Sequence, residues 1–485
     1  MRIGVYNLYW PTLGGGEQQA GGIVDALSAG HDVELLGPAG FDLGRARERL
    51  GLRLDGVSYR EVNGDEYSAS LLSGEYDLFV NHTYRSVAPN MAPKSVYFVM
   101  FPHDLDATRP VARAARRIGG RFAAPVRLLR GVTWHEGAPR IVGTVLVQIE
   151  PGVAQVELEV ESVRPEQLRI ASVDPVGAIE QVSLPVGSTR LRLPTGARSV
   201  VIEPSVMLEA LDADHAIVVK DIRADGARVV SSPSALAQRL APVRARDFIP
   251  TYTRFVSLSE YTRTWTQRWW GTDSDVISPP VQLREGGEKD RLIVSVGRFF
   301  GEGSGHSKRQ LEMVHAFRRL VEGGLTGWKL VLIGGCSAEH RDYAMSVRRA
   351  AEGLPVEVRL SAPGAVLDDH LARASIYWHA AGYGSDLDHH PERAEHFGIA
   401  PIEAMSAGAV PVVFGAAGPS EVVHPGQDGL VFRTIDELVA ATRSLIDDEA
   451  LRGRLAAAAV QSAQYYRRER FEDDVRSLVE RVTAG

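Results

Sequence analysis

Glu395 and Glu403, with seven residues between them, have the type and spacing to act on one polar ligand. Glu395 opens the loop sequence EHFG, and a helix expected to begin near Ile399 carries Glu403 one turn in. Free backbone N–H groups at the start of such a helix can receive anionic or hydroxyl oxygens. The two carboxylates could then address different parts of the same ligand. A capped helix with two solvated acids fits the same spacing.

Two cations upstream, Arg298 and Lys308, suit an anionic ligand such as a phosphate. Fixed cations favour a transition state in which negative charge grows beside them. Arginine offers a planar fork to phosphate oxygens, and lysine a compact point charge. Two surface cations are the alternative. The long glycine-rich link, residues 300–307, leaves Arg309 as a competitor for the place of Lys308.

Near the N-terminus, Gly14, Gly15 and Gly16 form a loop between an expected strand and an expected helix. Glycines there let the backbone approach a ligand closely, with N–H groups aimed at phosphate. The loop lacks G-x-G-x-x-G, which disfavours a nicotinamide dinucleotide site. A surface turn is the alternative. Farther along, His103 ends a strand, a place where histidine is usually structural.

The elements that must position these residues alternate between short apolar strands and helices, which favours parallel sheets covered on both faces. Ligands of such folds sit beyond the carboxyl ends of the strands. The expected strands are Arg2–Tyr6, Asp32–Gly37, Tyr76–Asn81, Ser95–Met100, Phe255–Leu258, Arg291–Val296, Lys329–Gly334, Val356–Leu360, Ile376–His379 and Val410–Phe414.

Between these two α/β regions, residues 137–225 show no helical period. Val156, Leu158 and Val160 alternate with glutamates, the period-2 signature of a half-buried strand, and Pro-Gly turn signals recur between such runs. We therefore expect an inserted all-β domain, sandwich-like in architecture.

The region around the two glutamates resembles the signature of retaining glycosyltransferases of family 4, which have the GT-B fold. Phe-Gly follows Glu395, Glu403 is followed by Ala-Met, and Gly408-Ala-Val-Pro comes next. Ser295-Val-Gly-Arg-Phe299 with Lys308 matches the family's Gly-Arg…Lys segment. Gly14-Gly-Gly-Glu17 followed by Gly30-His-Asp-Val33 matches its opening.

The resemblance implies an α/β GT-B chain with two doubly wound parallel-sheet domains facing a cleft. We expect residues 1–136 to form the N-terminal, acceptor-side domain, continuing over about 226–282, with a C-terminal helix, 466–485, as a further candidate part. Residues 283–465 would form the nucleotide-sugar-binding domain. The insertion is not covered by the resemblance.

The resemblance also implies roles for the candidate residues. Arg298 and Lys308 would bind the diphosphate without a metal. Glu403 would bind the ribose, and Glu395 the sugar hydroxyls. The imidazole or carbonyl of His103 would face the donor sugar. The expected catalytic residues are His103, Arg298, Lys308 and Glu395, and the expected donor-binding residues are Gly15, Gly16, Arg298, Lys308, Gly398, Ile399, Ala400 and Glu403.

No cofactor or metal is expected. Asp-x-Asp pairs occur too often to be informative, at Asp104, Asp212, Asp273 and Asp386 with the second residue after each. Histidines 379, 389, 390 and 396 match no closed zinc spacing.

The composition of the chain limits the classes of partner and the compartment that we expect for it. The chain has 485 residues, 44% hydrophobic and 24% charged, with a net charge of −7, which argues against a general nucleic-acid binder. Its single cysteine, Cys336, favours a reducing compartment, and no apolar run of bilayer length appears. We expect a cytoplasmic protein, with a peripheral position at the inner membrane face as a further option.

The expected partners are a nucleotide diphosphate-sugar and a glycan, lipid-linked or small-molecule acceptor. The arginine-rich segment Arg109–Arg130 contains no acid and could attract anionic membrane or an anionic acceptor. EHFGI and Ser259–Val281 resemble mannosyltransferases of glycolipid assembly, which suggests GDP-mannose and leaves UDP-sugars open. A non-catalytic sugar-nucleotide or glycan-binding protein on the same fold is the alternative function.

Overall fold

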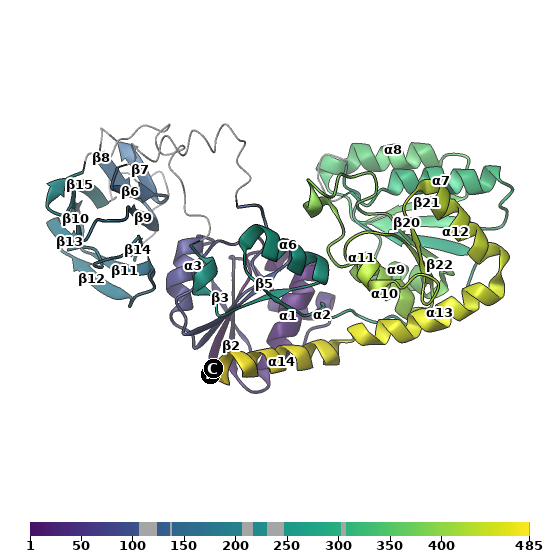
Figure 1. Cartoon of the computed structure of the whole chain (residues 1–485), viewed down its shortest axis with the longest axis horizontal. Coiled ribbons are helices and arrows are strands. Elements are labelled where there is room, and N and C mark those ends of the chain that lie inside the picture. Colours follow the sequence, from purple (N-terminus) through teal and green to yellow (C-terminus); the bar gives the residue numbers. More distant parts are fainter. Residues whose placement is uncertain (106–123, 136–137, 206–216, 230–246, 302–306, 485) are drawn as a thin grey trace.

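The computed structural model describes residues 1–105, 124–135, 138–205, 217–229, 247–301 and 307–484. A β-sandwich, an N-terminal α/β domain and a C-terminal α/β domain follow one another along the long axis (Figure 1). Each domain has its own core of buried apolar side chains.

The N-terminal domain is built on a seven-stranded parallel sheet in the order β18-β17-β5-β4-β1-β2-β3. Ile3 of β1 pairs with Val33 of β2 on one side and with Leu78 of β4 on the other, so the strand order reverses at β1. Both faces are covered, as expected for a parallel sheet. The elements are β1 (Arg2–Tyr6), α1 (Gly15–Ser28), β2 (Asp32–Gly37), α2 (Leu43–Leu50), β3 (Ser58–Glu61), α3 (Glu66–Ser73), β4 (Leu78–Asn81), β5 (Lys94–Val99), β17 (Arg254–Ser257), α6 (Glu260–Trp270) and β18 (Asp275–Val276).

The C-terminal domain repeats this design with a six-stranded sheet in the order β21-β20-β19-β22-β23-β24. The strand order reverses at β19, which lies between β20 and β22. Helices α7, α8 and α12 cover one face, and α9 and α10 the other. The elements are β19 (Leu292–Val296), α7 (Gln310–Glu322), β20 (Lys329–Gly334), α8 (Arg341–Ala351), β21 (Val356–Leu360), α9 (Gly364–Arg373), β22 (Ile376–His379), α10 (Ile399–Ser406), β23 (Val410–Phe414), α11 (Pro419–Val422), β24 (Leu430–Phe432) and α12 (Ile435–Asp447).

The β-sandwich consists of two antiparallel sheets, β12-β11-β14-β9-β6 and β13-β10-β15-β8-β7, with β16 paired to β15. The residues of β10 that alternate with glutamates, Val156, Leu158 and Val160, are buried between the sheets. The strands are β6 (Val126–Leu129), β7 (Val132–His135), β8 (Ala138–Ile141), β9 (Val145–Ile149), β10 (Val156–Ser162), β11 (Glu166–Asp174), β12 (Glu180–Leu184), β13 (Gly187–Arg192), β14 (Ser199–Pro204), β15 (Ile217–Ala224) and β16 (Ala227–Arg228).

The sandwich begins earlier in the chain than the expected residue 137. Two of its strands, β6 and β7, precede that position, and β16 follows residue 225. Each of these strands has four residues or fewer. Runs that short carry too few alternations for a period-2 pattern to be recognised.

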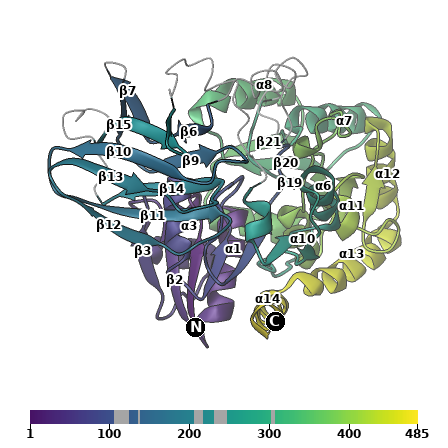
Figure 2. The ribbon, with the colours of Figure 1, turned by 60° about the vertical axis from the view of Figure 1, so that its left-hand side comes forward.

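The sandwich packs on α3 of the N-terminal domain, on the side away from the C-terminal domain (Figures 1 and 2). Tyr67 and Leu71 of α3 are buried against Leu146 and Val201 of the sandwich. At the edge of this contact, Arg169 lies 3.0 Å from Glu75 of the N-terminal domain. The sandwich therefore has an apolar interface with the domain into which it is inserted.

The last two helices connect the α/β domains. Helix α13 (Glu449–Ala463) packs on α10 of the C-terminal domain, whereas α14 (Arg468–Ala484) packs on α1 of the N-terminal domain (Figure 1). Phe471 of α14 is 1% exposed and belongs to the core of the N-terminal sheet. The chain thus returns to its first domain at its end.

Candidate active site

Lys308, Glu395 and His379 meet at the carboxyl edge of the C-terminal sheet. The Lys308 ammonium, just before α7, forms an ion pair with Glu395 Oε2. His379, the last residue of β22, places Nε2 3.3 Å from the same oxygen. The Lys308 and Glu395 side chains remain 23% and 21% exposed, whereas the His379 side chain is 3% exposed. The Lys308–Glu395 pair is therefore accessible to a ligand, and the buried His379 ring lies against Glu395.

The charge of Glu395 depends on its neighbours. Burial alone would raise its pKa, but the Lys308 charge and the His379 ring hold the pKa of Glu395 well below its usual range. Burial lowers the pKa of His379, so that its ring is neutral at neutral pH. The cluster therefore presents one ammonium and one carboxylate to a bound molecule.

Arg298 follows β19, the strand at which the order of the sheet reverses. An ideal Cβ on Gly297 would lie 2.7 Å from Lys308 Cγ, so Lys308 passes directly beside the backbone next to Arg298. The Arg298 side chain is exposed, with its guanidinium 4.8 Å above the Phe300 ring. Within the described residues, no carboxylate forms an ion pair with Arg298. The two expected cations are thus neighbours, and Arg298 is available to an anion.

Arg309, the competitor for the role of Lys308, faces elsewhere. Its guanidinium lies 3.2 Å from Glu312 and donates a hydrogen bond to Ser385 Oγ at 3.1 Å. Arg309 also has a left-handed backbone, with φ of 59°. Of the two adjacent cations, only Lys308 pairs with Glu395.

The start of α10 brings the remaining donor-binding candidates together. Gly398 precedes the helix with φ of 104°, a conformation that favours glycine, and leads into Ile399 and Ala400. One turn later, Glu403 Oε1 accepts hydrogen bonds from Arg284 Nε at 3.2 Å and Nη2 at 2.7 Å. Burial raises the pKa of Glu403, although the Arg284 charge acts against the rise.

The two α/β domains touch through the helix starts that each contributes. An ideal Cβ on Gly15, the first residue of α1, would lie 2.8 Å from Ile399 Cδ1, the first residue of α10. An ideal Cβ on Gly16 would likewise lie 3.2 Å from Met100 Cε. Absence of a side chain at residue 15 therefore permits the close approach of two helix N-termini, each with free N–H groups.

A stack of aromatic rings joins the same regions. Phe101, just after β5, stacks on His396 of the EHFG loop with ring centroids 4.1 Å apart and an interplanar angle of 10°. The hydroxyl of Ser259, at the start of α6, donates to the His396 carbonyl at 2.7 Å. Glu421 accepts from two N–H groups of α6, those of Glu260 and Tyr261, at 2.9 and 2.7 Å. Helix α6 thus connects the two α/β domains.

His103 lies beyond the end of β5, beside α6. Burial and the charge of Arg85 lower the pKa of His103 to about 4. The indole N–H of Trp270 donates to its carbonyl at 3.0 Å, and the two rings meet edge to face. The carbonyl is therefore already engaged once, and the neutral imidazole has a buried Nδ1 that finds no hydrogen-bond partner among the described residues.

Several other expectations concern residues away from this cluster. Five arginines of the segment Arg109–Arg130, those at 109, 113, 116, 117 and 121, lie outside the described residues, as do Asp106, Asp212 and Asp214. The guanidinium of Arg127 lies 2.9 Å from Glu150, and Arg130 lies over the Tyr67 ring. These last two arginines are therefore engaged by the protein itself.

In the described part of the chain, no three His, Cys, Asp or Glu side chains are grouped so as to hold a metal ion. The histidines near Glu395 instead form separate pairs, His389 with Asp386 at 2.9 Å and His390 with Glu392 at 3.3 Å. None of the described helices is long and apolar enough to cross a membrane.

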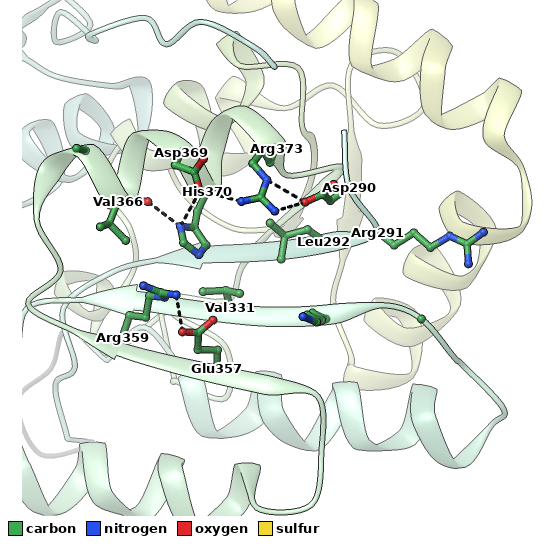
Figure 3. A pocket seen from close by; sticks show the side chains of 13 residues that line it. Asp290, Arg291, Leu292, Val331, Glu357, Arg359, Val366, Asp369, His370 and Arg373 are labelled. Carbon is green, nitrogen blue, oxygen red and sulfur yellow. Dashed lines mark hydrogen bonds and ion pairs between the residues drawn. The ribbon is translucent and has the colours of Figure 1, made fainter. Parts of the chain in front are cut away.

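A cavity of about 690 Å³ lies elsewhere in the C-terminal domain, between α9 and strands β19–β21 (Figure 3). Its charged walls are largely self-paired, as Arg373 contacts Asp290 at 2.5 Å and Arg359 contacts Glu357 at 2.6 Å. It is lined by the first residues of β19 and β20, whereas Arg298 and Glu395 follow the ends of strands. We therefore assign it no part in the candidate active site.

Two contributors were not predicted from the sequence. Arg284 holds Glu403 from 119 positions away. Gln310 donates to the carbonyls of Gly297 and Arg298 at 3.1 and 3.2 Å, which fixes the turn that carries Arg298. Neither belongs to a local pattern, and only the fold reveals them.

Comparison with known proteins shows what this chain is similar to. Residues 284–462 match the family described as "Glycosyl transferases group 1". The fold is GT-B: UDP- and glucose-bound HepE of Anabaena superposes with a TM-score of 0.54 at 12% identity, covering 99% of both chains. Sucrose-phosphate synthase of Thermosynechococcus elongatus gives 0.54 at 12% identity, covering 100% of this chain and 99% of its own. The match and the fold together support a glycosyltransferase.

The curated relatives are more specific. GDP-Man:Man(3)GlcNAc(2)-PP-Dol alpha-1,2-mannosyltransferase of Xenopus laevis is 27% identical over 204 residues, 37% of this chain and 39% of the relative. The human protein of that name is 28% identical over 207 residues, 39% of this chain and 38% of its own. D-inositol 3-phosphate glycosyltransferase of Nocardioides is 30% identical over 145 residues, 28% and 30% of the two chains. The similarity thus spans about two fifths or less of each relative.

Proposed function

We propose that this protein is a retaining glycosyltransferase that moves a hexose from a nucleotide diphosphate-sugar to an acceptor hydroxyl. The observation that carries the proposal is the group of Lys308, Glu395 and Arg298 at the carboxyl ends of β19 and β22. That position flanks the reversal of strand order, where α/β folds bind ligands. The meeting of Gly15 with Ile399 adds a second domain to the same site.

The donor proposed first is GDP-mannose. Relatives whose names include GDP-Man align over roughly two fifths of this chain, whereas the structural neighbours include a UDP complex. Arg298 and Lys308 would bind the diphosphate, with the N–H groups of Ile399 and Ala400 on its oxygens or on the sugar. Glu403 would accept from the ribose hydroxyls through Oε2, because Arg284 binds Oε1.

The reaction proposed is a same-face displacement. The bond between the anomeric carbon and the diphosphate oxygen breaks, the acceptor oxygen bonds to that carbon, and the acceptor proton passes to the leaving phosphate. Arg298 and Lys308 stabilise the charge that grows on the diphosphate. We assign Glu395 to sugar hydroxyls and not to nucleophilic attack, because its Oε2 is engaged by Lys308. The neutral His103 faces the other side of the sugar.

The test is direct. The purified protein is screened by thermal shift against GDP-mannose, UDP-glucose and ADP-glucose, because a ligand that binds the folded state raises the melting temperature. The donor that binds is then offered glycan, lipid-linked and small-molecule acceptors, and the product's anomeric configuration is read by NMR. Stabilisation by one donor and a product of unchanged configuration support the proposal. Activity should persist in EDTA, and an inverted product would refute retention.

The alternative is a sugar-nucleotide or glycan-binding protein without transfer. The ion pair of Lys308 with Glu395, and an Arg298 that pairs with no carboxylate of the described residues, favour catalysis over simple binding. The two functions separate in one measurement: a binder would be stabilised by a donor but would release no nucleoside diphosphate, even slowly to water.

A further inference from the structure

Two tyrosines and an arginine stand together where the N-terminal sheet reverses its strand order. Tyr9 lies in the loop after β1, and Tyr84 and Arg85 lie in the loop after β4. The rings of Tyr9 and Tyr84 are 6.4 Å apart between centroids, at 65°. The Arg85 guanidinium lies 5.1 Å from the centroid of the Tyr84 ring. None of them has a part in the donor site proposed above.

The two loops are fixed to each other by hydrogen bonds. Asn7 Oδ1 accepts from the Tyr9 N–H at 2.8 Å, and Thr83 Oγ1 accepts from the Leu8 N–H at 3.1 Å. Asn81 Oδ1 in turn accepts from the Thr83 N–H at 2.9 Å. The rings are therefore presented on a rigid support, although Tyr9 itself is 43% exposed.

Arg85 is a cation without a counter-charge. It is exposed, and within the described residues no acid forms an ion pair with it. Its backbone is left-handed, with φ of 59°, a conformation that costs energy for a residue with a side chain. Such positions concentrate at binding sites, where the surrounding structure holds them.

The group also lies beside the donor site. Arg85 and His103 follow the carboxyl ends of the paired strands β4 and β5. Burial lowers the pKa of His103 and the charge of Arg85 adds to the fall, whereas burial raises the pKa of Tyr84 and the charge of Glu392 of the C-terminal domain adds to that rise. The hydroxyl of Tyr261, on α6, donates to the Pro391 carbonyl at 2.9 Å, which holds the Glu392 segment against the N-terminal domain. A ligand bound by Arg85 would therefore lie at the same edge of the N-terminal sheet as His103.

We propose that Tyr9, Tyr84 and Arg85 form the acceptor subsite, which takes a polyol acceptor carrying a phosphate or phosphodiester group. The exposed ring of Tyr9 suits the C–H face of a sugar or cyclitol ring, and the Tyr84 ring supports both Tyr9 and Arg85. Arg85 supplies the charge-assisted hydrogen bonds that a phosphate receives from a guanidinium. The inference rests on the proposed function for the identity of the ligand as acceptor.

Calorimetric titration tests the subsite without donor. The probes are inositol 3-phosphate and mannose 6-phosphate, each against its unphosphorylated parent. The wild type should bind at least one phosphorylated probe about tenfold or more tightly than its parent, as expected for a charged hydrogen bond. Arg85→Gln should abolish that preference, and Tyr9→Ala should weaken both members of the pair. Arg470→Gln, which removes another arginine lying over a tyrosine ring, is the matched control.

A second arm distinguishes the source of the phosphate. Vesicles of phosphatidylcholine with and without phosphatidylinositol are co-sedimented with the same variants. Arg85-dependent binding to the phosphatidylinositol vesicles indicates a lipid headgroup, and Arg85-dependent binding of the soluble probes alone indicates a soluble acceptor. Equal binding of every phosphorylated probe and its parent, with no Arg85 dependence in either arm, overturns the proposal. The donor thermal shift is independent of this result, so the two proposals can fail separately.

Discussion

The positive charge of Lys308 keeps Glu395 ionised in the candidate active site. Lys308 is the cation that offsets the burial of Glu395, and its side chain lies against Gly297, next to Arg298. Its ammonium is therefore placed both to keep Glu395 ionised and to meet a diphosphate. A neutral residue at this position would remove both effects at once.

We predict that Lys308→Ala lowers kcat by about 10²–10³, the usual cost of removing one group that stabilises transition-state charge. Steady-state kinetics with the donor identified by thermal shift measures the change. Arg309→Ala is the matched control, because it removes the adjacent cation, which faces Glu312 and Ser385. Equal losses in the two variants would mean that the position of Lys308 beside Glu395 has no catalytic meaning.

Another titratable side chain, His82, gives a prediction about stability. It is buried beside Gln19, with Nε2 and Oε1 3.1 Å apart, and burial lowers its pKa to about 4. In the unfolded chain its pKa is near the ordinary value of about 6.5. As the pH falls, the unfolded state therefore takes up a proton on His82 before the folded state does. For this reason the free energy of unfolding decreases between about pH 6.5 and 4.

The wild type should accordingly lose about 2 kcal/mol more than His82→Gln when the pH is lowered from 7 to 5. Urea unfolding followed by fluorescence at both pH values gives the two differences. His389→Gln, at an exposed histidine, controls for a general effect of removing an imidazole. Parallel losses in wild type and His82→Gln would contradict the assignment.

For single residues, the sequence indicates which side chains could bind a donor, but not which of them form ion pairs with each other. Glu395 and Lys308 were expected as separate contacts to a donor, yet they form an ion pair across 87 positions. Arg284 was not expected to bind Glu403. Charges far apart in the chain are brought together by strand order, which local spacing does not encode.

Among the elements, two helix starts define the junction of the α/β domains. Gly15 begins α1 and Ile399 begins α10, and an ideal Cβ at residue 15 would lie 2.8 Å from the terminal methyl of Ile399. A larger residue there must displace Ile399 or separate the domains. Displacements of about 1 Å at a reacting centre can cost about 10² in rate.

Gly15→Val should therefore lower kcat by up to about 10²-fold while leaving the donor thermal shift largely intact, because most donor contacts belong to the C-terminal domain. Ile399→Ala, combined with Gly15→Val, should restore part of the activity by making room for valine. A double-mutant cycle on kcat measures the coupling. Additive losses, with no recovery in the double variant, would show that the contact does not set the domain approach.

Elements were predicted best where they are long and buried. The expected strands of both parallel sheets are present, with small shifts such as Leu78–Asn81 in place of Tyr76–Asn81. Strand β3, Ser58–Glu61, was not predicted, because an edge strand of four residues, two of them exposed and two half-buried, has no apolar pattern. Strand β18 was missed because its two residues are too few to show any periodicity.

The two α/β domains are held together by a chain that crosses between them twice. The first crossing leads from β18 to β19, and the second from α13 on the C-terminal domain to α14 on the N-terminal domain. Arg468 Nη1, at the start of α14, lies 3.4 Å from Oδ2 of Asp25, a fully buried carboxylate on α1. The C-terminal helix is therefore part of the N-terminal fold, and its core residues should matter to that domain.

Phe471 provides the test of this architecture. Its ring lies directly against Gly22, where an ideal Cβ would lie 2.9 Å from Phe471 Cε1. Phe471→Ala should cost about 3–5 kcal/mol, the usual range for a buried phenylalanine. That loss should lower the melting temperature of the N-terminal domain by about 10 °C in calorimetry.

The transition of the C-terminal domain, recognised by its upward shift with donor, should stay in place, because α14 packs on α1 and not on α10. Val163→Ala, at a side chain 55% exposed on the sandwich, is the control for a general loss of apolar surface. A drop confined to the donor-shifted transition would show that α14 stabilises the C-terminal domain instead. Since Phe471 lies 449 positions from Gly22 in the chain, such a loss in the first domain reports a contact that only the complete GT-B fold creates.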